Sequence, residues 1–245
     1  MRVLVKLLIA LLLAGVILFF AAEKIRAVGI HKGLAPLYVI PEDFERLNIE
    51  WWYNWSASCP TSPPGCVPMS WGGGDPNLSP DYDGYLLFLN EPDRPDQANK
   101  TPQEGVTLYK ALKAKYPLAK FVVGNSFYPI WLVDFYNLCK VDNNCIVPDI
   151  WGVHMYNGNR DFLPRNFELY EQYLDQLPGI VWLTEFANVY GDVYADNMML
   201  EWMKSYPKMR RKIQLQSLLY LKKICRIPPV LHHFPNLFLN LRVGS

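Results

Sequence analysis

The feature that most constrains the fold is a repeated alternation of short apolar runs with longer helical stretches. From Val28 onward, the apolar runs are short enough for strands and end at turn residues. We expect strands at 28–34, 49–53, 67–71, 85–89, 121–124, 150–155 and 180–186. We expect helices at 42–47, 101–116, 130–138, 167–177 and 196–205. Strands that alternate with helices predict parallel pairing through crossover connections.

Seven strands within about 160 residues favour an eight-stranded barrel over an open sheet. The expected fold class is therefore α/β, a compact (β/α)8 TIM barrel whose eighth strand is divergent or incomplete. The clearest helix boundary is Thr101-Pro102-Gln103-Glu104, where Thr caps the helix, Pro fills the first turn and Glu completes a capping box.

Composition excludes two classes of protein. The chain is 51% hydrophobic, which is enough apolar material for a core and rules out a disordered chain. Its formal net charge is +1, so nothing at the level of the whole chain supports a basic surface for nucleic acid. We expect no nucleic-acid partner.

The first 27 residues are predicted to be a targeting segment, with a buried core helix as the alternative. Arg2 and Lys6 precede an uncharged apolar run from Leu7 to Ala22, the pattern of a secretory signal. No Ala-x-Ala cleavage site ends the run, so residues 1–27 are either a cleaved signal peptide or an N-terminal membrane anchor. Both predict a secreted or extracytoplasmic domain, with membrane contact only through such an anchor.

The end of the chain differs in composition from the body. All 23 acidic residues lie at or before Glu201, whereas basic residues continue to Arg242. We therefore assign the catalytic barrel to residues 28–211 and a divergent basic tail to residues 212–245. A shifted reading frame or a replaced last strand would explain that tail. Residues 210–215 or 230–238 are candidates to fill the eighth strand position.

The cysteines predict local disulfides. Cys59 and Cys66 flank a Pro-rich loop, and Cys139 and Cys145 flank a short polar loop. Closed polar loops of this kind suit an oxidising compartment. Metal binding is the alternative, but neither pair has Cys-x-x-Cys spacing or a His cluster nearby.

Two carboxylates and several aromatic residues follow the expected strands. Glu91 follows the fourth strand, Glu185 ends the seventh, and Trp and Tyr recur at the other strand ends. In a β/α barrel the active site lies at the carboxyl ends of the strands. Cleavage of a glycosidic bond needs an acid for the leaving oxygen and a carboxylate on the opposite face of the sugar. The pattern therefore predicts a glycosidase.

Several motifs together are similar to one family. They are Lys32-Gly33-Leu34, Trp52-Tyr53-Asn54-Trp55, Val67-Pro68-Met69-Ser70-Trp71-Gly72, Asn90-Glu91-Pro92-Asp93, Gln97-Ala98-Asn99, His154-Met155-Tyr156 and Trp182-Leu183-Thr184-Glu185-Phe186-Ala187. In this order the chain resembles glycoside hydrolase family 128, secreted endo-β-1,3-glucanases with a compact barrel. The resemblance covers residues 28–211.

This resemblance implies roles for individual residues. Glu91 would be the general acid/base and Glu185 the nucleophile, which gives retention with carboxyl groups about 5–5.5 Å apart. Asn90, His154 and Tyr156 would surround the cleavage point, with Tyr156 holding the nucleophile. The residues expected to bind the glucan chain are Trp52, Asn54 and Trp71. No cofactor or metal is implied, and we expect a monomer.

Two other functions remain open. The altered C-terminus would leave a carbohydrate-binding or inactive remnant if the barrel failed to close. The same barrel would also serve a different polysaccharide, such as a β-1,4-glucan or a β-mannan.

Overall fold

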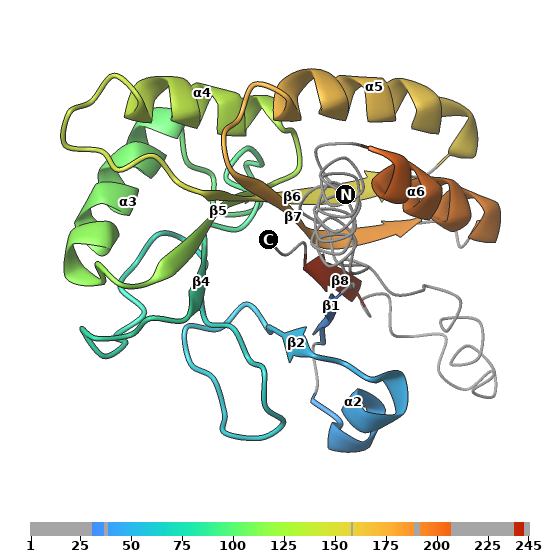
Figure 1. Cartoon of the computed structure of the whole chain (residues 1–245), viewed down its shortest axis with the longest axis horizontal. Helices are drawn as coiled ribbons and strands as arrows, with labels where there is room; N and C mark the ends of the chain where they lie inside the picture. Colours follow the sequence, from blue (N-terminus) through green and yellow to red (C-terminus); the bar gives the residue numbers. More distant parts are fainter. Residues whose placement is uncertain (1–30, 37–38, 158, 189–191, 207–237, 243–245) are drawn as a thin grey trace, which may run out of the picture.

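A sheet of eight strands runs through the molecule. The computed structural model describes residues 31–36, 39–157, 159–188, 192–206 and 238–242 (Figure 1). The strands are β1 (His31–Ala35), β2 (Trp51–Trp52), β3 (Met69–Ser70), β4 (Tyr85–Phe88), β5 (Lys120–Ser126), β6 (Ile150–Asn157), β7 (Ile180–Asn188) and β8 (Phe238–Arg242). Their order in the sheet is β2-β1-β8-β7-β6-β5-β4-β3.

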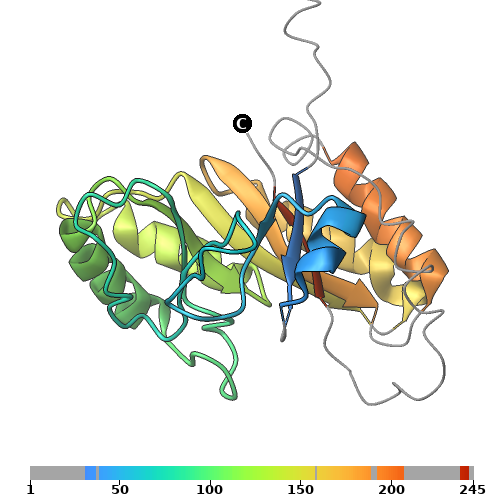
Figure 2. The ribbon, with the colours of Figure 1, turned by 90° about the horizontal axis from the view of Figure 1, so that it is seen from below.

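The first seven strands pair in parallel, which confirms the α/β class with a parallel sheet. β8 differs because it runs antiparallel to both of its neighbours, β1 and β7. Figure 2 shows β8 beside β1 at the centre of the molecule. The eighth position is thus filled by residues 238–242. This corrects the expected strand at 230–238, which shares only Phe238 with β8, while 210–215 lies wholly outside the described residues.

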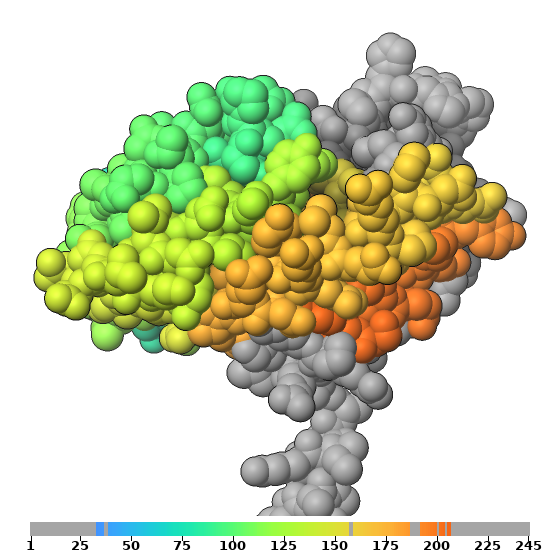
Figure 3. All heavy atoms as spheres, turned by 90° about the horizontal axis from the view of Figure 1, so that it is seen from above, coloured from blue at the N-terminus to red at the C-terminus, as the bar shows by residue number. Residues whose placement is uncertain are grey.

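Helices lie along the outside of this sheet. They are α2 (Pro41–Leu47), α3 (Pro102–Lys115), α4 (Ile130–Cys139), α5 (Leu163–Leu174) and α6 (Val193–Ser205), with a 3-10 turn, η1, at Arg160–Phe162. The capping box that opens α3 is present: Thr101 Oγ1 accepts from the Glu104 backbone, and the Glu104 carboxylate accepts from the Thr101 backbone. Figure 3 shows α4, α5 and α6 next to one another on the helical side.

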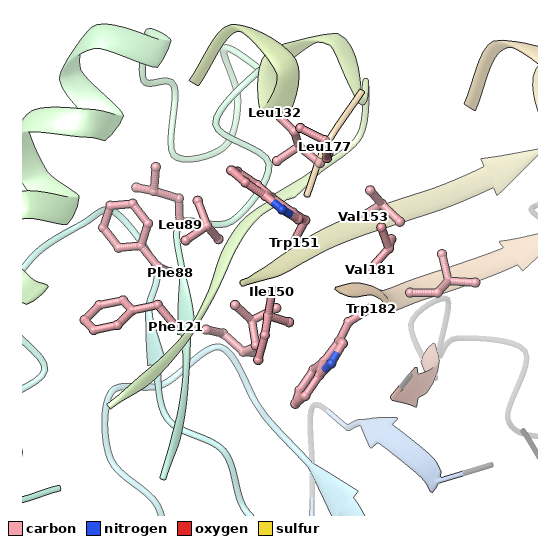
Figure 4. Packing of buried hydrophobic residues seen from close by; sticks show 14 of the residues in the cluster. Phe88, Leu89, Phe121, Leu132, Ile150, Trp151, Val153, Leu177, Val181 and Trp182 are labelled. Carbon is pink, nitrogen blue, oxygen red and sulfur yellow. The ribbon is translucent and has the colours of Figure 1, made fainter. Parts of the chain in front are cut away.

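Side chains of β6 and β7 divide between two packed layers. Trp151 points toward Leu132 of α4 and toward Leu177, so it fills the layer between sheet and helices (Figure 4). Trp182 lies on the other side of the sheet, where its ring contacts Trp51 of β2 and Tyr85 of β4. Strands far apart in the pairing order therefore share one apolar interior.

Two disulfides close short loops. Cys59 bonds to Cys66 in the segment between β2 and β3, and Cys139 bonds to Cys145 just after α4. Both predicted pairings are confirmed, and the metal-binding alternative for these cysteines is excluded because their sulfurs are bonded to each other.

The predicted targeting segment, residues 1–27, lies outside the described residues. Most of the basic tail, and Gly29 and Ile30 ahead of β1, do so as well. Within the described ranges, none of the helices has the length and apolar character required to cross a bilayer.

Candidate active site

Two glutamates from strands on different parts of the sheet meet in one buried cluster. Glu91 follows β4 and Glu185 lies in β7, and the two residues are 7% and 4% exposed. One oxygen from each carboxylate and one nitrogen of His154 in β6 lie within 4.8 Å of one another. Two carboxylates at this separation repel each other unless a proton or a hydrogen-bond donor stands between them.

His154 provides that donor. Its Nδ1 atom lies 2.9 Å from Glu91 Oε1 and 3.5 Å from Glu185 Oε2, and its ring is completely buried. Burial lowers the pKa of His154, but the negative charges of Glu185 and Glu91 outweigh this effect and leave the pKa above its ordinary value. The imidazole is thus held close to protonation between two carboxylates.

Three further donors surround Glu185. The Tyr53 hydroxyl donates to Oε1 at 2.5 Å, the Trp55 indole donates to the same oxygen at 3.0 Å, and the Tyr156 hydroxyl donates to Oε2 at 2.5 Å. Burial, together with the Glu185 charge, raises the pKa of both Tyr53 and Tyr156 well above the usual range. Both hydroxyls therefore keep their protons and donate them to the Glu185 carboxylate.

Glu91 has fewer hydrogen-bond donors around its carboxylate than Glu185 has, and its backbone conformation is unusual. Besides His154, its carboxylate has the Arg94 guanidinium as a partner, with Nε 3.5 Å from Oε2. Arg94 also lies over the ring of Phe127 and pairs with Asp96. Glu91 itself has a left-handed backbone, with φ of 42°. The two carboxylates therefore have unequal surroundings, as a pair that divides the acid and nucleophile roles requires.

The same cluster contains side chains of the kinds that bind divalent cations, namely two carboxylates and an imidazole. Glu91, His154 and Glu185 form the one group of three such side chains in the described part of the chain. Glu185 Oε1 already accepts hydrogen bonds from Tyr53 and Trp55, and Glu91 Oε1 lies 2.9 Å from His154 Nδ1. The arrangement therefore suits proton transfer and nucleophilic attack.

Comparison with known families decides what kind of site this is. A family model described as glycosyl hydrolase catalytic core matches residues 39–220, a span that contains the whole cluster. The chain belongs to this family. It is a glycosidase, as the paired carboxylates predicted.

Solved structures similar to this glycosyl hydrolase are enzymes of glycoside hydrolase family 128. An endo-β-1,3-glucanase from Sorangium cellulosum is 23% identical with a TM-score of 0.57, and the alignment covers 74% of this chain and 84% of that one. A curdlan-specific exo-β-1,3-glucanase from Blastomyces gilchristii, solved with glucose, is 26% identical with a TM-score of 0.54, covering 72% and 85%.

A third similar structure is an endo-β-1,3-glucanase mutant from Amycolatopsis mediterranei, bound to laminaritriose and laminaribiose. It is 23% identical with a TM-score of 0.51, and the alignment covers 64% of this chain and 71% of that one. No curated protein matches the chain. The likeness to family 128 seen in the sequence motifs is confirmed at the level of the domain.

The glycosyl hydrolase brings most of its predicted site residues to the cluster. Glu91, Glu185, His154 and Tyr156 are joined by the hydrogen bonds described above. Asn90 is buried next to Glu91, and its Nδ2 donates to Gln97 Oε1 at 3.1 Å. Its Oδ1 is a buried acceptor with no hydrogen-bond partner among the described residues, so it is available to a hydroxyl.

The three residues expected to bind the glucan chain have different positions. Trp71 follows β3, is 38% exposed and accepts a backbone hydrogen bond from Asn90. Asn54 is partly buried, and its Oδ1 has no partner in the described structure. Trp52 is fully buried against Phe44 of α2, and its indole donates to the Pro63 carbonyl. This corrects the expectation for Trp52, because a ring packed between sheet and helix has no surface for a sugar.

Sequence reasoning missed Tyr53 and Trp55 as site residues. β2 ends at Trp52, but the rings of residues 51, 53 and 55 contact one another in series, while Trp52 packs against Phe44 of α2. The contacts in this series are the stacked rings of Trp51 and Tyr53 and the edge contact between Tyr53 and Trp55. The aromatic residues at every second position from 51 to 55 were the sequence signal that would have identified them.

Proposed function

We propose that the protein is a retaining glycoside hydrolase that cleaves β-1,3-glucan within the chain. The observation that carries this proposal is the separation of the carboxylates, whose nearest oxygens lie within 4.8 Å. Retaining glycosidases hold their two carboxyl groups about 5–5.5 Å apart, whereas inverting ones leave about 6.5–9.5 Å for a water molecule. The short distance here supports the retaining arrangement.

Glu185 is the nucleophile in this proposal. Its three hydrogen-bond donors fix the orientation of the carboxylate for attack on the anomeric carbon. Attack breaks the bond to the leaving sugar and forms a glycosyl ester with Glu185. Hydrolysis of this ester by water restores the carboxylate with the original anomeric configuration.

Glu91 is the general acid and base. It gives a proton to the leaving oxygen in the first step and takes one from the attacking water in the second. His154, within hydrogen-bond distance of Glu91, offsets the negative charge that the two carboxylates concentrate. The unpaired Asn90 Oδ1 would accept from a sugar hydroxyl beside the cleaved bond.

The similar enzymes, which are endo- and exo-acting β-1,3-glucanases by their descriptions, support this substrate class. The half-exposed Trp71 and the polar Asn54 would contact the glucan chain. A β-1,4-glucan or β-mannan specificity is the alternative on the same fold.

We also propose that the sheet closes as a (β/α)8 barrel. Backbone hydrogen bonds from Val67 to Trp52 and from Met69 to Ser56 connect the β3 end of the sheet with the β2 end. The contact between Trp51 and Trp182 across the interior supports the same closure. The catalytic domain then spans residues 28–211 with β8 added from the tail. The two disulfides support a location outside the cytoplasm.

Release of reducing sugar by the purified protein tests the proposal, with β-1,3-glucan, β-1,4-glucan and β-mannan as substrates. We expect activity on β-1,3-glucan, with the β-anomer as the first product by NMR. Glu91→Gln and Glu185→Gln should each lower kcat by about 10²-fold or more, whereas Glu168→Gln, an exposed position on α5, should not. Binding of the glucan without release of sugar by the unmodified protein would favour the inactive remnant.

A further inference from the structure

The carboxyl end of β5 contains an irregularity next to Glu91. Val123 pairs with Trp151 and Ser126 pairs with Val153, so β5 carries one more residue than β6 across this interval. The two residues within the bulge, Gly124 and Asn125, have positive φ angles of 97° and 46°. Bulges near active sites redirect side chains, and this one turns Asn125 into the protein interior, where it is fully buried.

The side chain of Asn125 binds the end of β4. Its Nδ2 donates to the carbonyl of Leu89 at 2.9 Å and to the carbonyl of Phe88 at 3.3 Å. It also lies 3.3 Å from the carbonyl of Val122 in its own strand. Carbonyl oxygens only accept hydrogen bonds, so the amide nitrogen, and not the amide oxygen, must face them.

The backbone of Asn125 binds Glu91 directly. The Glu91 N–H donates to the Asn125 carbonyl at 3.0 Å. Asn125 therefore holds the chain on both sides of Asn90, through Leu89 before it and Glu91 after it. Leu89 and Glu91 both have left-handed backbones, with φ of 64° and 42°. Side chains of this size persist there only where neighbouring groups fix the backbone.

A glycine in the neighbouring strand β6 leaves space for the side-chain amide of Asn125. A Cβ atom on Gly152 of β6 would lie 2.3 Å from Asn125 Oδ1. That oxygen is buried without a hydrogen-bond partner in the described structure. The Asn125 nitrogen has three acceptors, whereas its oxygen has no donor among the described residues. The structural contribution of this amide therefore comes from its nitrogen.

We propose that Asn125 is a positioning residue for Glu91. Its amide and its carbonyl fix the left-handed turn that directs the acid toward the glycosidic oxygen. The inference rests on the proposed role of Glu91 as general acid. Without the amide, the turn relaxes and the Glu91 proton no longer meets the leaving oxygen. The rate of cleavage is then little affected for a substrate whose leaving group needs no protonation.

Two substrates that differ in their need for an acid test this inference. Laminarihexaose has a sugar leaving group that requires protonation, whereas 2,4-dinitrophenyl β-laminaribioside releases a phenolate that does not. The measured quantity is kcat/KM, which reports the steps up to formation of the glycosyl ester. Misfolded protein would lower kcat/KM equally for both substrates, so their ratio is independent of folding yield.

Asn125→Gly is the main variant, because glycine keeps the positive φ and removes only the amide. We expect kcat/KM to fall by about 10²-fold on laminarihexaose and by less than about threefold on the dinitrophenyl substrate. Asn125→Asp preserves the shape of the side chain but turns an oxygen toward the carbonyls, and it should show the same selective loss. Asn143→Gly and Asn143→Asp, in the exposed loop after α4, serve as matched controls.

Equal losses on both substrates, or no loss on laminarihexaose, in both Asn125 variants would overturn the inference. Glu91→Gln, measured in parallel, separates this result from a failure of the proposed function. If Glu91→Gln discriminates between the substrates and the Asn125 variants do not, only the positioning role is wrong. If Glu91→Gln does not discriminate either, the acid role of Glu91 is wrong as well.

Discussion

Tyr53→Phe removes one hydroxyl that donates to the buried carboxylate of Glu185. The hydroxyl lies 2.5 Å from Glu185 Oε1, and Tyr53 has no exposed surface. Water therefore cannot take its place in the folded protein. Trp55 still donates to the same oxygen at 3.0 Å, so the variant keeps a partner for Oε1 and should fold.

The expected loss follows from the charge of the acceptor. A hydrogen bond to a charged group contributes about 1.5–3 kcal/mol to stability, whereas one between neutral groups contributes about 0.5–1.5 kcal/mol. Tyr53→Phe should therefore lower the free energy of unfolding by about 1.5–3 kcal/mol, and Tm by roughly 3–12 °C for a chain of this size. In a Glu185→Gln background the acceptor is neutral, and the loss should fall by about 1 kcal/mol.

A double-mutant cycle measured by urea unfolding with the disulfides intact tests this reasoning. Tyr194→Phe is the matched control, because Tyr194 is 71% exposed and its ring contact with Arg160 survives the change. The control should stay within about 0.5 kcal/mol of the unmodified protein. Equal losses for Tyr53→Phe in both backgrounds would refute the claim that the hydroxyl stabilises a negative charge on Glu185.

Three other expectations concern stability. The pKa of His154 is raised because nearby carboxylates outweigh its burial, so its contribution is complete below about pH 6.5 and is lost as pH rises through the higher folded value. Urea unfolding should show the deficit of His154→Gln shrinking as the pH rises above about 6.5, and a constant deficit would contradict this. Hydrogen bonds from Lys115 and Tyr116 lower the pKa of Asp75 to about 2, so melting curves of Asp75→Asn should differ from those of the unmodified protein at neutral pH and converge as the pH falls toward that value. Leu241→Pro places proline in β8, a strand paired on both sides, and should lower Tm by more than roughly 4 °C; an unchanged Tm would show that the pairing of β8 contributes little.

Local chemistry made much of the fold predictable. The Thr101 capping box fixed the start of α3, and apolar runs located the first seven strands to within a few residues. Positions at strand ends brought Glu91 and Glu185 to the same site, because parallel strands place their carboxyl ends at one edge. The predicted start of α5 was four residues late, because α5 begins directly after the 3-10 turn η1 and its N-cap residue, Phe162, offers no capping side chain in the sequence.

What the sequence did not show depends on contacts between distant elements. The antiparallel direction of β8 shows only in its pairing with β1 and β7, which lie far from it in the sequence, so local propensity does not reveal it. The burial of Trp52 requires the position of Phe44 on α2. The importance of Asn125 requires the bulge in β5, and only Gly124-Asn125 at a strand end signals it.

β8 lies much closer in the sheet order to the strand that carries Glu185 than to the strand that precedes Glu91. In the sheet order, β8 adjoins β7, which carries Glu185, and is separated from β4, which precedes Glu91, by β7, β6 and β5. Its pairs with β7 are at Leu183 and Phe186, on either side of Glu185. The acid depends instead on the contact of Asn125 with the end of β4. A change in the tail therefore acts first on the nucleophile, while the backbone that positions the acid is built entirely from elements that precede the tail.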